Sequence, residues 1–315
     1  MNFRTGLSIA LGLLSFTAAQ AAVVRPGAPQ LLDPSPSTCA VPATFAVGGV
    51  PTRVLFLAGL GGVSVKWDGQ PVRVLWPRAQ LKGGEQRSGG VFLATNLGVL
   101  DSVDGTYVRY CSPLRFSLVS PYGYVRDSAG LWSLTDDGHF SLVNLPIAPW
   151  RNVVGFAPST NYLYGPNLLW VGTAAGLSYQ KGLYQAVFVN GRTYPALGLP
   201  DFQRVTDICG ITGGLLMVYN GIVLRHQDSA DPYAPLFTDT GLAPASYALQ
   251  SLRYGPNDVD AVAYIGRTLW LNLGSPAPTA VLMPGAIRHV ANDPDRHELI
   301  VSTSAGVFAV PYTLG

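Results

Sequence analysis

The stretch 168-LLWVGTAAGLSYQKG-182 decides the fold of this chain. It contains an apolar run, a turn of small residues that ends at Gly176, a second apolar run and a closing Lys-Gly pair. Two short apolar runs around a glycine predict two strands joined by a tight turn, because glycine adopts positive φ without steric cost. A second stretch, 299-LIVSTSAGVFAV-310, repeats the spacing with Gly306 at the matching position.

The same unit recurs along the chain, and each copy has one anchor position between two apolar runs. Clear copies are 54-VLFLAGLGGVSVKWDG-69 and 91-VFLATNLGVLDSVDG-105, and in a weak copy Arg267 replaces the glycine. The anchors are residues 62, 98, 130, 176, 221, 267 and 306, between 32 and 46 residues apart. This spacing is that of four short strands per propeller blade. The sequence therefore predicts an all-β fold, a β-propeller of seven blades with four antiparallel strands each; the weak copy leaves six or eight blades open.

Composition agrees with short strands and frequent turns. The chain has 36 glycines, 25 prolines and 48% hydrophobic residues, which is too punctuated for long helices and too apolar for disorder. Charged residues make up 12% of it, against about 25% in ordinary domains. A formal net charge of +2 argues against nucleic acid or an anionic membrane surface as the partner.

The N-terminus has the three parts of a secretory signal peptide. Arg4 provides a positive charge, residues 7–16 are mostly apolar, and Ala19 and Ala21 form an Ala-x-Ala end. The apolar run is shorter than the roughly 20 residues that span a bilayer. We therefore expect residues 1–21 to be removed and the mature protein to be secreted or periplasmic and not membrane-embedded; a retained anchor is the alternative.

The residues that follow form a leader, 22–40, ahead of the propeller at 41–315. Only residues 307–315 follow the last anchor, which is enough for a third strand but not a fourth. We predict that part of the leader supplies the missing outer strand of the last blade, so that its deletion lowers stability sharply. The alternative is a disordered leader, since Pro26, Pro29, Pro34 and Pro36 all lie within it.

Two of the copies carry a family resemblance. The run Trp170-Val171-Gly172-Thr173, continued to Gly176 and Leu177, resembles the repeat of two-component-regulator propellers. Residues 290–306 are similar to BNR/Asp-box and photosystem-assembly-type propeller repeats. The near-matches at 102–105 and 135–138 are out of register and lack the terminal tryptophan, which argues against a sialidase. The resemblance implies a sensory, scaffolding or assembly propeller and leaves its ligand open.

Counting fourteen residues back from the later anchors reaches polar residues on the predicted innermost strands. These are Asp207, Arg253 and Asn292, with Arg204 and His289 three residues upstream of the first and the last. Polar groups that converge on one mouth of a channel suit a small-ligand site. The predicted ligand-binding residues are therefore Arg204, Asp207, Arg253, His289 and Asn292. The alternative is that these side chains pair with one another and with channel water.

A second predicted surface is aromatic. Tyr162 and Tyr164 lie in a proline-bounded insertion of the repeat, and Trp150 lies just upstream. Exposed aromatic residues are enriched at protein interfaces. The partner-binding loop is therefore predicted at Trp150, Tyr162 and Tyr164, with packing between blades as the alternative.

Catalytic and metal signals are weak. No nucleophile elbow, metalloprotease motif, phosphate loop or Cys-His signature occurs, so we assign no catalytic residue and no cofactor. Acidic loops at 228–239 and 257–260 could hold calcium, although turn formation explains them equally well. Cys39, Cys111 and Cys209 allow one disulfide, with the pairing open.

These observations favour a non-catalytic binding or scaffold protein that recognises a protein or cell-envelope partner. One alternative is a glycan- or lactone-directed hydrolase or lyase that uses the channel mouth on a small ligand. Another is a purely structural surface protein.

Overall fold

The computed structural model describes most of the two ends of the chain and the strands between them. The described residues are 23–59, 61–87, 90–102, 108–110, 118–119, 124–126, 131–134, 140–143, 153–159, 168–173, 176–181, 185–189, 205–227, 237–255 and 258–315.

The described strands form seven antiparallel sheets, numbered here in chain order. Sheet 1 contains β3 (Ala40–Val47), β4 (Val50–Gly59), β5 (Gly62–Trp67) and β6 (Arg73–Pro77); sheet 2 contains β7 (Leu81–Arg87), β8 (Gly90–Thr95), β9 (Gly98–Ser102) and β10 (Val108–Tyr110). Sheet 3 contains β11 (Leu118–Val119), β12 (Tyr124–Arg126), β13 (Leu131–Leu134) and β14 (Phe140–Val143); sheet 4 contains β15 (Val153–Ser159), β16 (Leu168–Thr173), β17 (Gly176–Lys181) and β18 (Gln185–Val189).

The C-terminal third repeats this order. Sheet 5 contains β19 (Val205–Ile211), β20 (Gly214–Tyr219), β21 (Ile222–Gln227) and β22 (Phe237–Asp239); sheet 6 contains β23 (Ala248–Gly255), β24 (Asp258–Ile265), β25 (Thr268–Leu271) and β26 (Thr279–Leu282). Sheet 7 contains β27 (Ile287–Asp293), β28 (Glu298–Thr303) and β29 (Gly306–Leu314), joined by β1 (Val24–Pro26) and β2 (Gln30–Asp33). Each anchor position from the sequence begins, or directly precedes, the third strand of its sheet.

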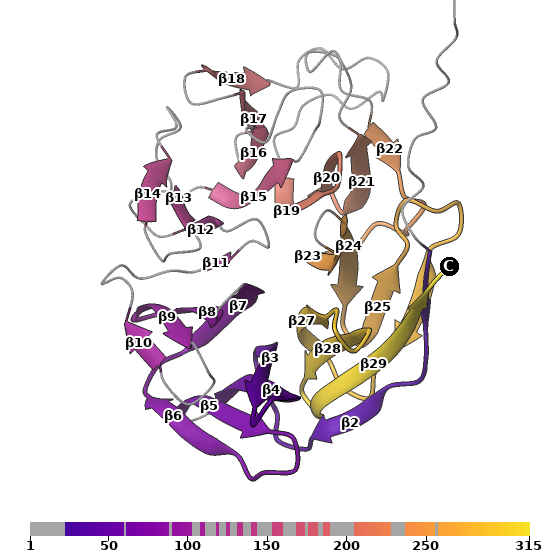
Figure 1. Cartoon of the computed structure of the whole chain (residues 1–315). Coiled ribbons are helices and arrows are strands. Elements are labelled where there is room, and N and C mark those ends of the chain that lie inside the picture. Colours follow the sequence, from indigo (N-terminus) through magenta and orange to yellow (C-terminus); the bar gives the residue numbers. More distant parts are fainter. Residues whose placement is uncertain are drawn as a thin grey trace, which may run out of the picture.

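The sheets radiate from a common centre, and their first strands lie innermost (Figure 1). β3 contacts both β7 and β27, and β23 contacts both β19 and β27, so the last sheet lies against the first. Because strands alternate in direction, the described turns between second and third strands lie on one face of the molecule, which we call the 2–3 turn face. The turns between first and second strands lie on the opposite face, the 1–2 turn face.

The N-terminal segment completes sheet 7. β2 pairs with the first part of β29 and β1 with its last part, so that residues 24–33 follow β29 along its outer edge. The glycine anchors show that β2 takes the place of a fourth strand. A Cβ atom on Gly62 would overlap the carbonyl oxygen of Trp76 in β6, and a Cβ atom on Gly306 would overlap that of Asp33 in β2.

Two side chains fasten this segment to the neighbouring sheets. Asn272 of sheet 6 accepts a hydrogen bond from the Val24 amide and donates one to the Val24 carbonyl, both at 2.8 Å. Lys66 of sheet 1 donates to the Leu32 carbonyl and pairs with the Asp33 carboxylate at 2.7 Å. Burial alone would raise the pKa of Asp33, but the hydrogen bonds from Lys66 and Ser35 outweigh it and lower the pKa.

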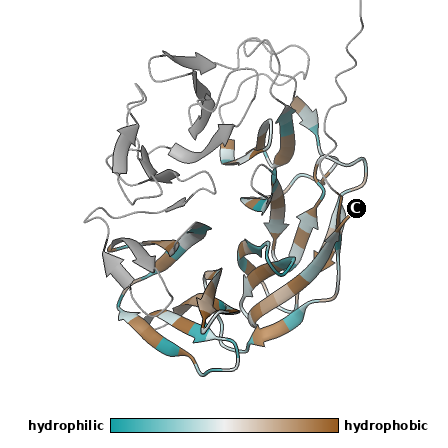
Figure 2. Ribbon diagram, viewed as in Figure 1, coloured by the Kyte–Doolittle hydropathy of each residue, from teal (hydrophilic) through white to brown (hydrophobic). Residues whose placement is uncertain are grey.

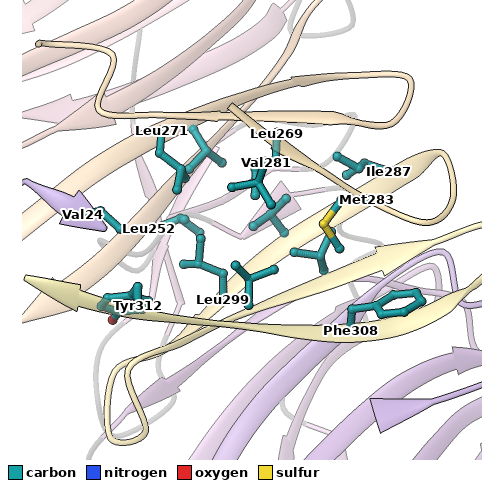
Figure 3. Packing of buried hydrophobic residues seen from close by; sticks show 14 residues of the cluster. Val24, Leu252, Leu269, Leu271, Val281, Met283, Ile287, Leu299, Phe308 and Tyr312 are labelled. Atoms are coloured by element: carbon teal, nitrogen blue, oxygen red, sulfur yellow. The ribbon is translucent and has the colours of Figure 1, made fainter. Parts of the chain in front are cut away.

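The core lies between the sheets. β20 is buried at every residue, because a sheet covers each of its faces. The cluster in Figure 3 joins Leu269 and Val281 of sheet 6 to Leu299 and Phe308 of sheet 7, and Val24 of β1 completes it. In Figure 2 the strands of sheets 1, 6 and 7 carry hydrophobic residues along much of their length. Among the described residues, no helix has the length and apolar character needed to cross a membrane.

Candidate functional site

The predicted channel residues that the structure describes lie on first strands: Asp207 on β19, Arg253 on β23, and His289 and Asn292 on β27. Asp207 accepts a hydrogen bond from the Leu249 amide of β23 at 2.8 Å and one from the Ile208 amide at 2.9 Å. Its carboxylate therefore ties the first strand of sheet 5 to that of sheet 6.

The other first strands are joined in the same way. Asn292 donates from Nδ2 to the carbonyl of Arg253, and Ser251 donates from Oγ to the carbonyl of Gly210 at 2.7 Å. Gln86 of β7 accepts a hydrogen bond from the Thr44 amide of β3 at 2.8 Å and donates one from Nε2 to the Thr44 carbonyl at 3.0 Å. In a radial arrangement each innermost strand has a free edge, and buried backbone groups there need partners. Side chains of neighbouring sheets provide these partners.

His289 faces sheet 1. Burial lowers the pKa of His289 from 6.5 to about 4, although a hydrogen bond with the backbone of Ala40 works against this shift. The imidazole is therefore neutral at neutral pH. Its Nδ1 atom is buried and has no hydrogen-bond partner.

The other predicted site residues stay predictions. Arg204, Trp150, Tyr162 and Tyr164 lie outside the described residues, as does Cys111. Cys39 and Cys209 are buried free thiols whose pKa is raised by burial, which makes them poor nucleophiles.

The sequence pattern missed two cations at the mouth of the channel. Lys82 and Arg288 are each the second residue of a first strand, and each is the extra residue at a break in strand register. Both side chains are exposed. A β-bulge re-aims the side chain of its extra residue. First strands begin at the 2–3 turn face, so both cations lie at that mouth.

Tyr264 of β24 lies at the same mouth. Its hydroxyl donates to the carbonyl of Arg288 at 3.4 Å. Burial raises the pKa of Tyr264 above its usual value, and the negative charges of Asp207 and Cys39 raise it further. The sequence shows only that Tyr264 directly precedes the anchor turn. The contact of its hydroxyl with Arg288 depends on how sheets 6 and 7 pack together.

The junction between sheets 7 and 1 carries a second charged cluster, on the 1–2 turn face. Arg53 of β4 pairs with Asp68, Nε to Oδ1 at 3.3 Å, and with Glu298 of β28. Arg296 pairs with Asp68 at 2.9 Å. The charges of Arg53 and Arg296 are therefore neutralised within the molecule.

Asp293 lies next to this cluster and is 3% exposed. Burial raises its pKa to about 6; Arg53 and Arg296 oppose the rise, and Asp295 and Glu298 add to it. Its Oδ2 atom has no hydrogen-bond partner. The carboxyl group, with its pKa of about 6, thus changes charge at mildly acidic pH at the junction of the last and first sheets.

The acidic loops named for calcium are described only in part. Asp258 and Asp260 both have a pKa raised by burial, and Asp260 accepts a hydrogen bond from the Ala261 amide. Within the described residues, no three His, Cys, Asp or Glu side chains come together as a metal site would need. A calcium site therefore stays a prediction.

Comparison with solved structures agrees with this architecture. The chain aligns with PorZ of Porphyromonas gingivalis, a bacterial surface component of the type-IX secretion system, at a TM-score of 0.62 and 12% identity over 91% of the chain and 39% of PorZ. It aligns with the WD40 β-propeller domain of Doa1 at a TM-score of 0.52 and 12% identity, over 92% and 97% of the two chains. The extracellular domain of BT4673 from B. thetaiotaomicron gives a TM-score of 0.55 and 12% identity, over 93% and 38%.

These likenesses show the fold: the chain is an all-β protein of the β-propeller class. It spans well under half the length of PorZ and of the BT4673 structure. No protein-family model and no curated protein matches the sequence. The resemblance to two-component-regulator and BNR/Asp-box repeats therefore rests on the quoted residues.

Proposed function

We propose that this chain is a secreted or periplasmic propeller of seven blades, one per sheet, that works without catalysis by binding a protein or cell-envelope partner. The signal-peptide pattern of residues 1–21 supports export. PorZ, a surface component of a secretion system, and the extracellular domain of BT4673 have the same fold, which is compatible with work outside the cytoplasm.

The observation that carries this proposal is that polar side chains near the propeller axis form hydrogen bonds to the backbone of neighbouring sheets. Asp207, Ser251 and Asn292 each bond to the backbone of the neighbouring first strand, so these three side chains hold neighbouring sheets together. Among the described residues, two buried polar atoms near the axis, His289 Nδ1 and Asn292 Oδ1, have no hydrogen-bond partner. A catalytic site needs such groups directed at a substrate. The turn faces and the outer edges are then the surfaces with which the molecule meets its partner.

Photo-crosslinking in the native envelope tests this function. A photo-reactive residue is placed in turn at Arg267 on the 2–3 turn face, at Val50 on the 1–2 turn face and at Leu282 on an outer edge, all of them exposed. We expect a discrete macromolecular adduct from one surface and none from the others. Absence of an adduct from all three, or turnover of glycan or lactone substrates by the purified protein, would contradict the proposal.

A further inference from the structure

Four exposed cations lie on the 2–3 turn face, and we call them the basic rim. They are Arg78, Lys82, Arg267 and Arg288. Lys82 and Arg288 come from the bulges at the start of β7 and β27, on either side of sheet 1. The rim therefore extends along an arc over sheets 6, 7, 1 and 2.

Backbone contacts fix the turns that carry Arg267 and Arg78. The Arg267 side chain donates from Nε to the Met283 carbonyl at 2.8 Å, and the Ile287 amide, one residue before Arg288, donates to the Gly266 carbonyl at 2.7 Å. The amide of Arg78 donates to the Gly61 carbonyl at 3.0 Å, which holds it against the 2–3 turn of sheet 1. Arg78 and Arg267 both remain exposed despite these contacts.

The named cations of the two faces differ in whether they form ion pairs. On the 1–2 turn face, Arg53 and Arg296 are paired with Asp68 or Glu298. On the four sheets that carry the rim, the acid with a described side chain at this face is Asp33, which is 3% exposed and paired with Lys66. Asp207 and Asp239 lie at the same face on the neighbouring sheet 5. Over sheets 6, 7, 1 and 2 the rim is thus a positive surface with no exposed acid among the described side chains, in a chain whose net charge is only +2.

We propose that the basic rim binds an acidic segment of the protein partner, an inference that rests on the proposed function. Guanidinium groups, which form three of the four cations, bind carboxylates through two parallel hydrogen bonds. Cations distributed over four sheets fit an extended chain of carboxylates better than one compact anion. An anionic membrane fits less well, because attraction to a lipid surface is strongest for cations clustered in one segment, and the four rim cations come from separate sheets.

The first test measures binding of a fluorescein-labelled oligo-glutamate peptide to the mature protein by fluorescence anisotropy. We expect saturable binding that weakens as sodium chloride rises, since salt screens exposed charges. The double variant Lys82→Glu/Arg288→Glu is expected to bind about tenfold more weakly, because two attractions become repulsions.

The matched control is Arg25→Glu/Arg73→Glu, which makes the same change in net charge at exposed cations of the outer strands β1 and β6. It should bind the peptide as the wild type does. An equal loss in both double variants would show a general charge effect and overturn the proposal, as would absence of peptide binding at low salt. Circular dichroism melting of both variants checks that the fold is intact.

Other occupants give other results. If the rim binds phosphatidylglycerol vesicles but not the peptide, the surface is a membrane-binding site. If equimolar inorganic phosphate displaces the peptide, the surface binds a small anion. Either result would overturn the proposal. In the envelope, an adduct from Val50 and none from Arg267 would leave the proposed function standing while the rim fails. An adduct from Arg267 that the Lys82→Glu/Arg288→Glu change abolishes would support both.

Discussion

At the scale of single residues, Asp293 links the stability of the chain to pH. Its pKa in the folded protein is raised from 3.8 to about 6 by burial. The folded state therefore holds the proton more tightly than the unfolded chain, and ionisation of Asp293 destabilises the fold. This penalty is absent below about pH 4, grows between the two pKa values and is complete above about pH 6.

Asp293→Asn should remove this penalty, because a carboxamide fills the same space without ionising. We expect the variant to be more stable than the wild type by about 1–3 kcal/mol at pH 8 and equally stable at pH 4, measured by urea unfolding. Asp68→Asn is the control: Asp68 is exposed and ion-paired, so its loss should cost about 1 kcal/mol or less at pH 8. Parallel pH profiles for Asp293→Asn and the wild type would show that Asp293 does not titrate as described.

Gly306 is a second residue with a large expected effect. Its φ is 132°, and a Cβ atom would overlap the carbonyl oxygen of Asp33. Gly213 has a φ of 69° but open space around its Cβ position. Gly213→Ala should therefore cost only the backbone strain, about 1–2 kcal/mol, while Gly306→Ala should cost more and loosen β2. Equal free energies of unfolding for the two variants would argue against close contact between β2 and β29.

At the scale of elements, Asn272 decides whether β1 stays docked. Its amide group makes both hydrogen bonds to Val24, and its φ of 56° suits asparagine or glycine. Asn272→Gly removes the bonds without adding strain, so we expect faster amide hydrogen exchange at Val24 and Thr313, with β2 unaffected. The measurement is hydrogen exchange followed by NMR. Faster exchange at Val24 with unchanged protection at Thr313 would mean that pairing with β29 alone holds β1.

The strands also show how much of the fold and of the candidate site could be predicted from the sequence. The anchors predicted the starts of third strands, because a turn with positive φ restricts the local residue type, as at Gly62 and Gly306. The counting rule placed Asp207 and Asn292 on innermost strands. It did not show that their side chains bond to adjacent strands, and it missed Lys82 and Arg288. A bulge is defined by the pairing of two strands, so its extra residue has no signature in one strand alone.

At the scale of the whole molecule, the N-terminal segment joins three sheets. β1 and β2 complete sheet 7, Asn272 ties β1 to sheet 6, and Lys66 ties β2 to sheet 1. The last sheet lies against the first, and residues from both ends of the chain form this junction. Opening this junction would expose the outer edge of β29 and the part of the core that Val24 covers.

Removal of residues 22–33 should therefore destabilise the whole ring rather than its edge. We expect the midpoint of thermal unfolding to fall by about 10 °C or more, since several kcal/mol of pairing and burial are lost. A chain in which residues 22–33 are scrambled, with length and composition kept, is the matched control and should melt like the deletion. A synthetic peptide of residues 22–35 should restore the midpoint of the deletion protein, because it can pair with β29 from solution. An unchanged midpoint would mean that β27, β28 and β29 hold sheet 7 against its neighbours without the N-terminal strands, and that the leader contributes no closure to the propeller.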